Sequence, residues 1–175
     1  MKGFVHIYTG DGKGKTTAAV GLALRACGRG KRVLFYQFLK CEPSGEELAL
    51  AGTNLPFTVR RAEGHVRFSW QMTAAERAEA CARQGRHLAQ ARGELAAGMC
   101  DLMVLDEIVC AVENDFLPLA DLEQFVRERP EGTELLLTGA GAGQRILALG
   151  DYVSVISKQK HPFDTGVAAR EGIEF

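Results

Sequence analysis

The chain has 175 residues, of which 46% are hydrophobic and 25% are charged, a composition typical of globular proteins. This length suffices for one domain with a complete hydrophobic core, so we expect a single domain over residues 1–175. The formal net charge of −1 argues against broad binding to a nucleic-acid backbone, and no apolar run is long enough to span a bilayer, so neither nucleic acid nor membrane is an expected partner.

Strand and helix patterns alternate along the chain. An apolar run at 4–8 precedes a glycine-rich turn, and a helical pattern follows from Thr16 to Arg25. Further strands are predicted at 32–39, 57–61, 102–105, 135–138 and 152–156, and further helices at 74–97, 119–128 and 144–149. Thr73 is expected to cap the long helix, with Glu76 as its capping-box partner. This alternation predicts an α/β fold with a mainly parallel sheet covered by helices on both faces.

The turn after the first strand carries the strongest chemical signal. A strand, a glycine-rich turn and a helix that begins at Gly-Lys-Thr form a P-loop, whose backbone N–H groups surround the phosphates of a nucleoside triphosphate. Lys15 would contact the outer phosphates, and the Thr16 hydroxyl would reach Mg²⁺. Thr9 stands where the common pattern has its first glycine, so this loop is one residue shorter. We expect a RecA-like P-loop NTPase fold. The predicted ATP-binding residues are Thr9, Gly10, Asp11, Gly12, Lys13, Gly14, Lys15, Thr16 and Thr17.

Two carboxylates follow the predicted strand at 102–105. Ligands of parallel α/β sheets bind at the carboxyl ends of strands, so we expect Asp106 or Glu107 to hold Mg²⁺ (or Mn²⁺) opposite Thr16. The sequence leaves open which carboxylate contacts the metal, and Thr16, Asp106 and Glu107 are all candidate ligands. The candidate catalytic residues are Lys15, Thr16 and Glu107.

Other residues carry weaker signals. Phe68 and Trp70 place two aromatic side chains on one side of an extended segment, a pattern more typical of core packing. Arg60, Arg61 and Arg67 can meet anionic groups, although a solvated face is the ordinary interpretation. Five cysteines are dispersed without C-x-x-C spacing, which beside an ATP site indicates reduced thiols and a cytoplasmic protein.

Nearly the whole chain resembles the ATP:corrinoid adenosyltransferase family, the cob(I)yrinic acid a,c-diamide and cob(I)alamin adenosyltransferases. The resemblance rests on residues 8–19, 37–40 (QFLK), 104–107 (VLDE) and, most diagnostically, 160–175. The shortened P-loop is also a feature of this family. In the family, the Co(I) of a reduced corrinoid attacks the 5′ carbon of ATP, and inorganic triphosphate leaves as one piece. The resemblance therefore implies an enzyme of adenosylcobalamin biosynthesis or salvage, with ATP and a reduced corrinoid as co-substrates.

The resemblance also implies site residues and partners. Phe68 and Trp70 align with aromatic residues that pack against the lower face of the corrin, so they are expected corrinoid contacts. A homodimer and an electron-donating flavoprotein reductase are further expectations. The family commonly carries an arginine where this chain has Ala140, and Arg145 and Lys158 are candidates to replace it. This departure leaves two alternatives open, an ATP-binding paralogue without adenosyl transfer and a P-loop ATPase or kinase.

Overall fold

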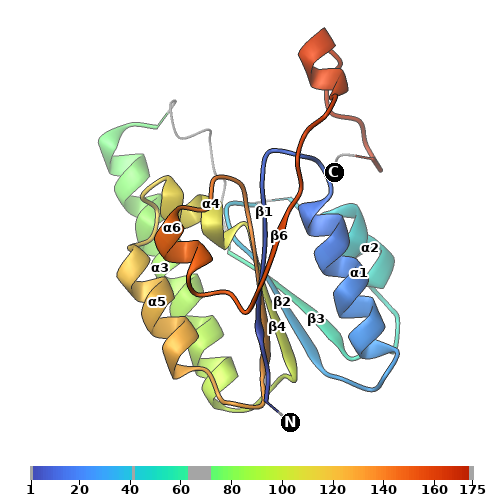
Figure 1. Cartoon of the computed structure of the whole chain (residues 1–175), viewed down its shortest axis with the longest axis vertical. Helices are drawn as coiled ribbons and strands as arrows, with labels where there is room; N and C mark the ends of the chain where they lie inside the picture. The colour runs from blue at the N-terminus through green and yellow to red at the C-terminus, as the bar shows by residue number, and fades with distance from the viewer. Residues whose placement is uncertain (1, 41, 63–71, 174–175) are drawn as a thin grey trace.

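The structure is a computed structural model that describes residues 2–40, 42–62 and 72–173 (Figure 1). Its strands are β1 (Val5–Thr9), β2 (Val33–Gln37), β3 (Phe57–Arg61), β4 (Leu102–Asp106), β5 (Glu134–Thr138) and β6 (Tyr152–Val155). Its helices are α1 (Lys15–Cys27), α2 (Gly45–Leu50), α3 (Ala74–Ala96), α4 (Ile108–Glu113), α5 (Leu119–Glu128), α6 (Gln144–Leu147) and the 3₁₀ helix η2 (Pro162–Thr165). The predicted alternation is confirmed, although the short helices α2, α4 and η2 were not predicted.

The described strands form one parallel sheet in the order β3-β2-β4-β5-β1-β6. Parallel neighbours need crossover connections, and the helices supply them on both sides of the sheet. Helices α1 and α2 cover one face, and α3 to α6 cover the other (Figure 1). The predicted α/β fold with helices on both faces is therefore confirmed.

Apolar side chains fill both layers between sheet and helices. Every residue of β2 and β4 is buried, which explains why these strands are nearly continuous apolar runs. On one face, Ala19 and Ala23 of α1 pack in a cluster with Val104 of β4. On the other, Leu88 of α3 and Phe125 of α5 belong to a larger cluster. Because the strands are parallel, the residues that follow β1, β2, β4 and β5 meet at one edge of the sheet.

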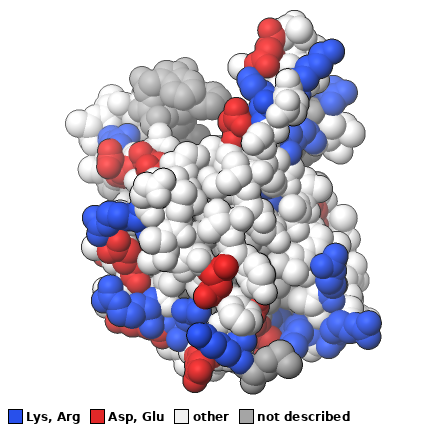
Figure 2. Space-filling view, viewed as in Figure 1, with Lys and Arg blue, Asp and Glu red and all other residues white. Residues whose placement is uncertain are grey.

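Strand β6 forms an edge of the sheet and is exposed along its length. Figure 2 shows few charged side chains in the middle of this face of the molecule, where β6 runs in Figure 1. Tyr152, Val153 and Val155 are exposed apolar side chains on this strand. An exposed edge with apolar side chains is a surface on which another chain can pair. None of the helices in the described ranges is both long and apolar enough to cross a membrane.

Helix α3 begins as the sequence predicts. The Thr73 hydroxyl accepts the Glu76 N–H at 3.2 Å, and the Glu76 carboxylate accepts the Thr73 N–H at 2.8 Å. Further along, α3 buries His87, whose ring centroid lies 4.8 Å from that of Tyr36 and 4.9 Å from that of Phe38. Burial lowers the pKa of His87 to about 4, so its imidazole is neutral at neutral pH.

His87 is expected to make the fold less stable in acid. The unfolded chain protonates this imidazole near pH 6.5, whereas the folded chain resists protonation down to about pH 4. Because the unfolded state binds more protons between these values, the free energy of unfolding should fall by about 3 kcal/mol as the pH drops through that window. Urea unfolding of the natural chain and His87→Gln, at about pH 7 and about pH 4.5, measures the effect. The variant should lose less stability on acidification, and an equal loss in both chains would contradict this assignment.

Candidate nucleotide site

The backbone conformation of the turn between β1 and α1 requires glycine at positions 10 and 12. Gly10 has a φ of 106°, a conformation that residues with a side chain rarely adopt. A Cβ atom at Gly12 would lie 2.7 Å from the backbone oxygen of Ile156, and the Gly12 N–H donates to that oxygen at 2.8 Å. The turn therefore packs directly against the chain that follows β6, and this packing holds its shape.

Lys15 is the first residue of α1, and its ammonium group lies over the glycine-rich turn. Its Nζ donates to the backbone oxygens of Gly10 at 2.8 Å and Gly12 at 2.9 Å. The amino end of α1 opens at the same place, where unpaired helical N–H groups carry partial positive charge. An ammonium group and a helix terminus together provide the charge that a phosphate chain requires.

Asp106, at the carboxyl end of β4, is fully buried and joins three other elements through its carboxylate. Its Oδ1 accepts hydrogen bonds from the hydroxyls of Thr16 at 2.9 Å and Thr138 at 2.8 Å. Its Oδ2 accepts from the Nζ of Lys40 at 2.7 Å. The donors come from α1, β5 and the segment after β2, so Asp106 links the P-loop to the neighbouring strand ends. The predicted proximity of Thr16 and Asp106 is confirmed.

Glu107 has a different environment from Asp106. It has a φ of 63°, and its N–H donates to the Thr138 hydroxyl at 2.9 Å. Its carboxylate lies beside Cys110, where burial first and Glu107 second raise the pKa of the thiol to about 12. The described contacts thus bring the carboxylate of Asp106 to Thr16 and that of Glu107 to Cys110.

The sequence profile described as ATP:corrinoid adenosyltransferase BtuR/CobO/CobP matches residues 1–175. This chain belongs to the ATP:corrinoid adenosyltransferase family. It is 40% identical to a corrinoid adenosyltransferase of Escherichia coli K12 over 176 residues, which cover 99% of this chain and 86% of the relative. It is 39% identical to corrinoid adenosyltransferase CobA of Salmonella typhimurium with the same coverage. A corrinoid adenosyltransferase of Pseudomonas aeruginosa is 31% identical and covers 99% of this chain and 84% of the relative.

A comparison with solved structures supports the fold. The crystal structure of a KaiC-like protein from Pyrococcus horikoshii matches with a TM-score of 0.50 and 15% identity, covering 91% of this chain and 75% of that chain. At this identity, the likeness concerns only the fold. The fold is that of a P-loop NTPase, as the sequence predicts, and the predicted membership of the adenosyltransferase family is confirmed.

Lys40 is a residue of this candidate site that the sequence alone did not identify. The preceding Leu39 has a φ of 57°, a left-handed conformation that is uncommon for leucine. The turn at Leu39 brings Lys40 to the end of β4, the strand beside β2. Such backbone strain persists where the surrounding structure holds it, often at a functional site. The sequence feature that could have pointed to Lys40 is the QFLK segment at the end of a strand. Its ion-pair partner Asp106 could not be predicted, because the sequence does not reveal that β2 and β4 are neighbours.

The Thr16 hydroxyl and the Asp106 carboxylate form a donor set that suits a hard cation. Mg²⁺ prefers oxygen ligands and is commonly bound by one or two carboxylates together with substrate phosphates and water. In the part of the chain that the structure describes, no group of three His, Cys, Asp or Glu side chains is placed to hold a metal. A divalent cation at Asp106 would therefore take some of its oxygen ligands from a bound phosphate chain.

The two candidates to replace the missing arginine at Ala140 are engaged elsewhere. Arg145 donates to Glu123 of α5 at 2.9 Å. The side chain of Lys158 donates to Asp164 of η2 at 2.9 Å. Lys40, bound directly to Asp106, is the cation that these contacts add to Lys15 in the site.

The C-terminal segment returns to the P-loop. The Lys158 N–H donates to Asp11 at 2.9 Å, and this contact is the main cause of a lowered pKa at Asp11. The Nζ of Lys13 donates to the backbone oxygen of Ile173 at 2.9 Å. In Figure 1 this segment, shown in orange and red, extends past the edge of the sheet at which the P-loop lies. The contact between Lys13 and Ile173 thus joins the most diagnostic part of the sequence to the predicted ATP-binding residues.

The remaining predicted site residues differ in how they are placed. The Thr9 hydroxyl accepts the Ala142 N–H at 3.3 Å, and Thr9 is buried. Thr17 is exposed in the first turn of α1. Phe68 and Trp70, the predicted corrinoid contacts, lie outside the described residues.

Proposed function

We propose that this corrinoid adenosyltransferase transfers the 5′-deoxyadenosyl group of ATP to the Co(I) of a reduced corrinoid and releases inorganic triphosphate. The observation that carries the proposal is the meeting of Lys15, Thr16 and the buried Asp106 in one site, in a chain that belongs to this family. In the reaction, Co(I) supplies the electron pair of the new cobalt–carbon bond. The bond between the 5′ carbon and oxygen breaks, and the triphosphate takes its electron pair.

The residues around Asp106 suit a reaction in which negative charge develops on a leaving triphosphate. Lys15 and the amides of the glycine-rich turn would bind the phosphate chain, and their charge stabilises it as it leaves. Thr16 and Asp106 would hold Mg²⁺ or Mn²⁺, with Glu107 as a second candidate ligand. Such a cation would neutralise phosphate charge when bound.

Lys40 would supply positive charge that other family members obtain from an arginine at the position of Ala140. Its ammonium lies 2.7 Å from the Asp106 carboxylate, at the strand end beside the P-loop edge. A lysine on a flexible stem can exchange this carboxylate for a phosphate oxygen when ATP binds. Since cobalt is itself the nucleophile, no side chain needs to act as a general base, and positioning of the two substrates dominates catalysis.

Phe68 and Trp70 would contact the lower face of the corrin, as the resemblance implies. An apolar wall there would exclude water and the lower axial ligand, which eases reduction to Co(I) because that state prefers fewer axial donors. A homodimer, a flavoprotein electron donor and a cytoplasmic location complete the proposal. The exposed apolar edge at β6 supports self-association.

The proposed function is tested by whether ATP consumption depends on the corrinoid. The protein is incubated with Mg-ATP in the absence of oxygen, with and without chemically reduced cob(I)alamin, and the phosphate products are separated. We expect ATP to stay intact without the corrinoid and to yield triphosphate with it. Release of ADP and phosphate in both reactions would instead indicate a P-loop ATPase or kinase. Bound ATP that is not consumed in either reaction would indicate a paralogue that has lost the chemistry, for which Ala140 provides a reason.

A further inference from the structure

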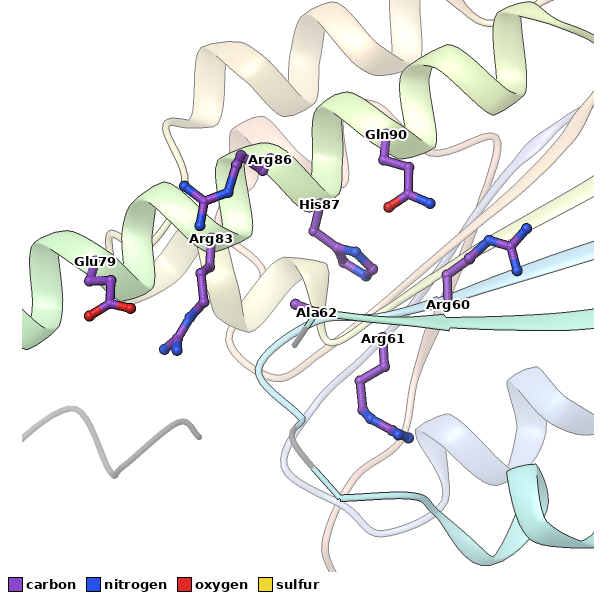
Figure 3. A pocket seen from close by; sticks show the side chains of 8 residues that line it. All are labelled: Arg60, Arg61, Ala62, Glu79, Arg83, Arg86, His87 and Gln90. Atoms are coloured by element: carbon purple, nitrogen blue, oxygen red, sulfur yellow. The ribbon is translucent and has the colours of Figure 1, made fainter. Parts of the chain in front are cut away.

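A pocket of about 630 Å³ lies between the carboxyl end of β3 and helix α3 (Figure 3). Four arginines line it, Arg60 and Arg61 from β3 and Arg83 and Arg86 from α3. Glu79 is the carboxylate among the described lining residues, and Glu94 and Glu47 pair with Arg60 and Arg61, so four arginines stand against three carboxylates. Figure 3 shows that the α3 side chains come from one face of that helix, which is the face turned toward the end of β3.

Two of these arginines are anchored by carboxylates outside the lining. The Nε of Arg60 donates to Glu94 at 3.1 Å, and the Nη1 of Arg61 donates to Glu47. A guanidinium group carries five N–H donors, so one such contact leaves further donors for a ligand. Anchored side chains also lose less conformational entropy when a ligand binds.

His87 also belongs to the wall of the pocket and is only 5% exposed. Burial lowers the pKa of its imidazole, and hydrogen bonds with the backbone of Gln37 and Arg60 offset part of that effect. His87 is therefore a neutral part of the wall at neutral pH, and the positive charge of the pocket comes from the arginines.

The pocket lies at the same edge of the sheet as the nucleotide site. Strand β3 is two positions from β4 in the sheet, so these two strands lie about 10 Å apart. Strand β4 ends at Asp106. A large substrate that reacts near the P-loop can therefore extend one side of its periphery into this pocket.

We propose that this arginine pocket binds oxyanion groups at the periphery of the corrinoid. The shared chemistry is a carboxylate or phosphodiester oxygen that accepts paired N–H bonds from guanidinium groups. The inference rests on the proposed function and adds a substrate preference to it. Corrinoids with free carboxylates or with a nucleotide-loop phosphate should bind more tightly than corrinoids that have neither.

Three corrinoids separate the possible sources of the anion. Cobyrinic acid a,c-diamide carries free carboxylates and no phosphate, cobalamin carries a phosphodiester, and cobinamide carries neither group. Binding of each to the natural chain, Arg83→Gln and Arg86→Gln is measured by titration. Arg127→Gln, an exposed arginine on α5, is the matched control. We expect Arg83→Gln and Arg86→Gln to raise the Kd for at least one anionic corrinoid about tenfold, and that for cobinamide less than about twofold.

The anionic corrinoid that loses affinity identifies which oxyanion the pocket binds. Equal changes for all three corrinoids, no change for any of them, or the same change in Arg127→Gln would overturn the inference. Adenosyl transfer to cobinamide by the natural chain distinguishes this failure from failure of the proposed function. If transfer occurs and the arginine variants show no selective loss, only the pocket assignment is wrong. If the natural chain adenosylates none of the three corrinoids, the proposed function itself is wrong.

Discussion

Replacement of Lys15 by alanine is expected to lower the rate of adenosyl transfer by about a thousandfold or more. The Lys15 ammonium lies within 2.9 Å of two backbone oxygens of the P-loop, where it is positioned to contact a phosphate chain entering the turn. Its removal takes away a full positive charge that stabilises the triphosphate as it leaves. Steady-state rates and ATP affinity should both fall, because the same charge binds ATP and stabilises its leaving group.

Lys31→Ala is the matched control for Lys15→Ala. Lys31 is an exposed lysine beyond the opposite end of α1, and its backbone N–H donates to Ala26. This variant should retain the natural rate within about twofold, as is usual for surface substitutions. Unchanged transfer in Lys15→Ala would show that the glycine-rich turn is not the triphosphate site.

Replacement of Asp106 by asparagine should lower transfer to a similar extent, by about a thousandfold. The change keeps the size of the side chain but removes the charge that faces Thr16 and Lys40. The natural chain should show saturable dependence on Mg²⁺ concentration, and the residual activity of the variant should lose this dependence. Loss of the ion pair with Lys40 should also lower the free energy of unfolding by about 1–3 kcal/mol.

Asp101→Asn separates a structural effect from an effect on the site. Asp101 precedes the amino end of the same strand and forms an ion pair with Arg32 at 3.2 Å. This variant should lose some stability and keep its dependence on Mg²⁺. If Asp106→Asn retained the natural Mg²⁺ dependence, Asp106 would not be a metal ligand, and Glu107 would become the candidate to test.

Most of the fold could be predicted because each main element has a local signal. The apolar run before Gly10, the capping box at Thr73 and the alternation of strand and helix patterns are all visible in the sequence, and the structure confirms them. The helices α2 and α4 span six residues each, too few to display helical periodicity. The strand predicted at 32–39 ends at Gln37, because Leu39 turns into a left-handed conformation.

The site could be predicted only where the motif itself carries the chemistry. The P-loop and the carboxylates after β4 follow from strand ends and residue types, which place Thr16 near Asp106. The ion pair between Lys40 and Asp106 depends on β2 lying beside β4, and sequence order does not reveal that neighbour. The arginine pocket was missed for the same reason, since Arg60 and Arg83 are brought together by the packing of α3 on the sheet.

The most direct test of the central claim is an anaerobic reaction of the protein with Mg-ATP and chemically reduced cob(I)alamin. The visible spectrum reports formation of the cobalt–carbon bond while the phosphate products are quantified in the same sample. The account predicts adenosylcobalamin and inorganic triphosphate in equal amounts. Consumption of ATP without a cobalt–carbon bond, or binding of ATP without any consumption, would contradict it.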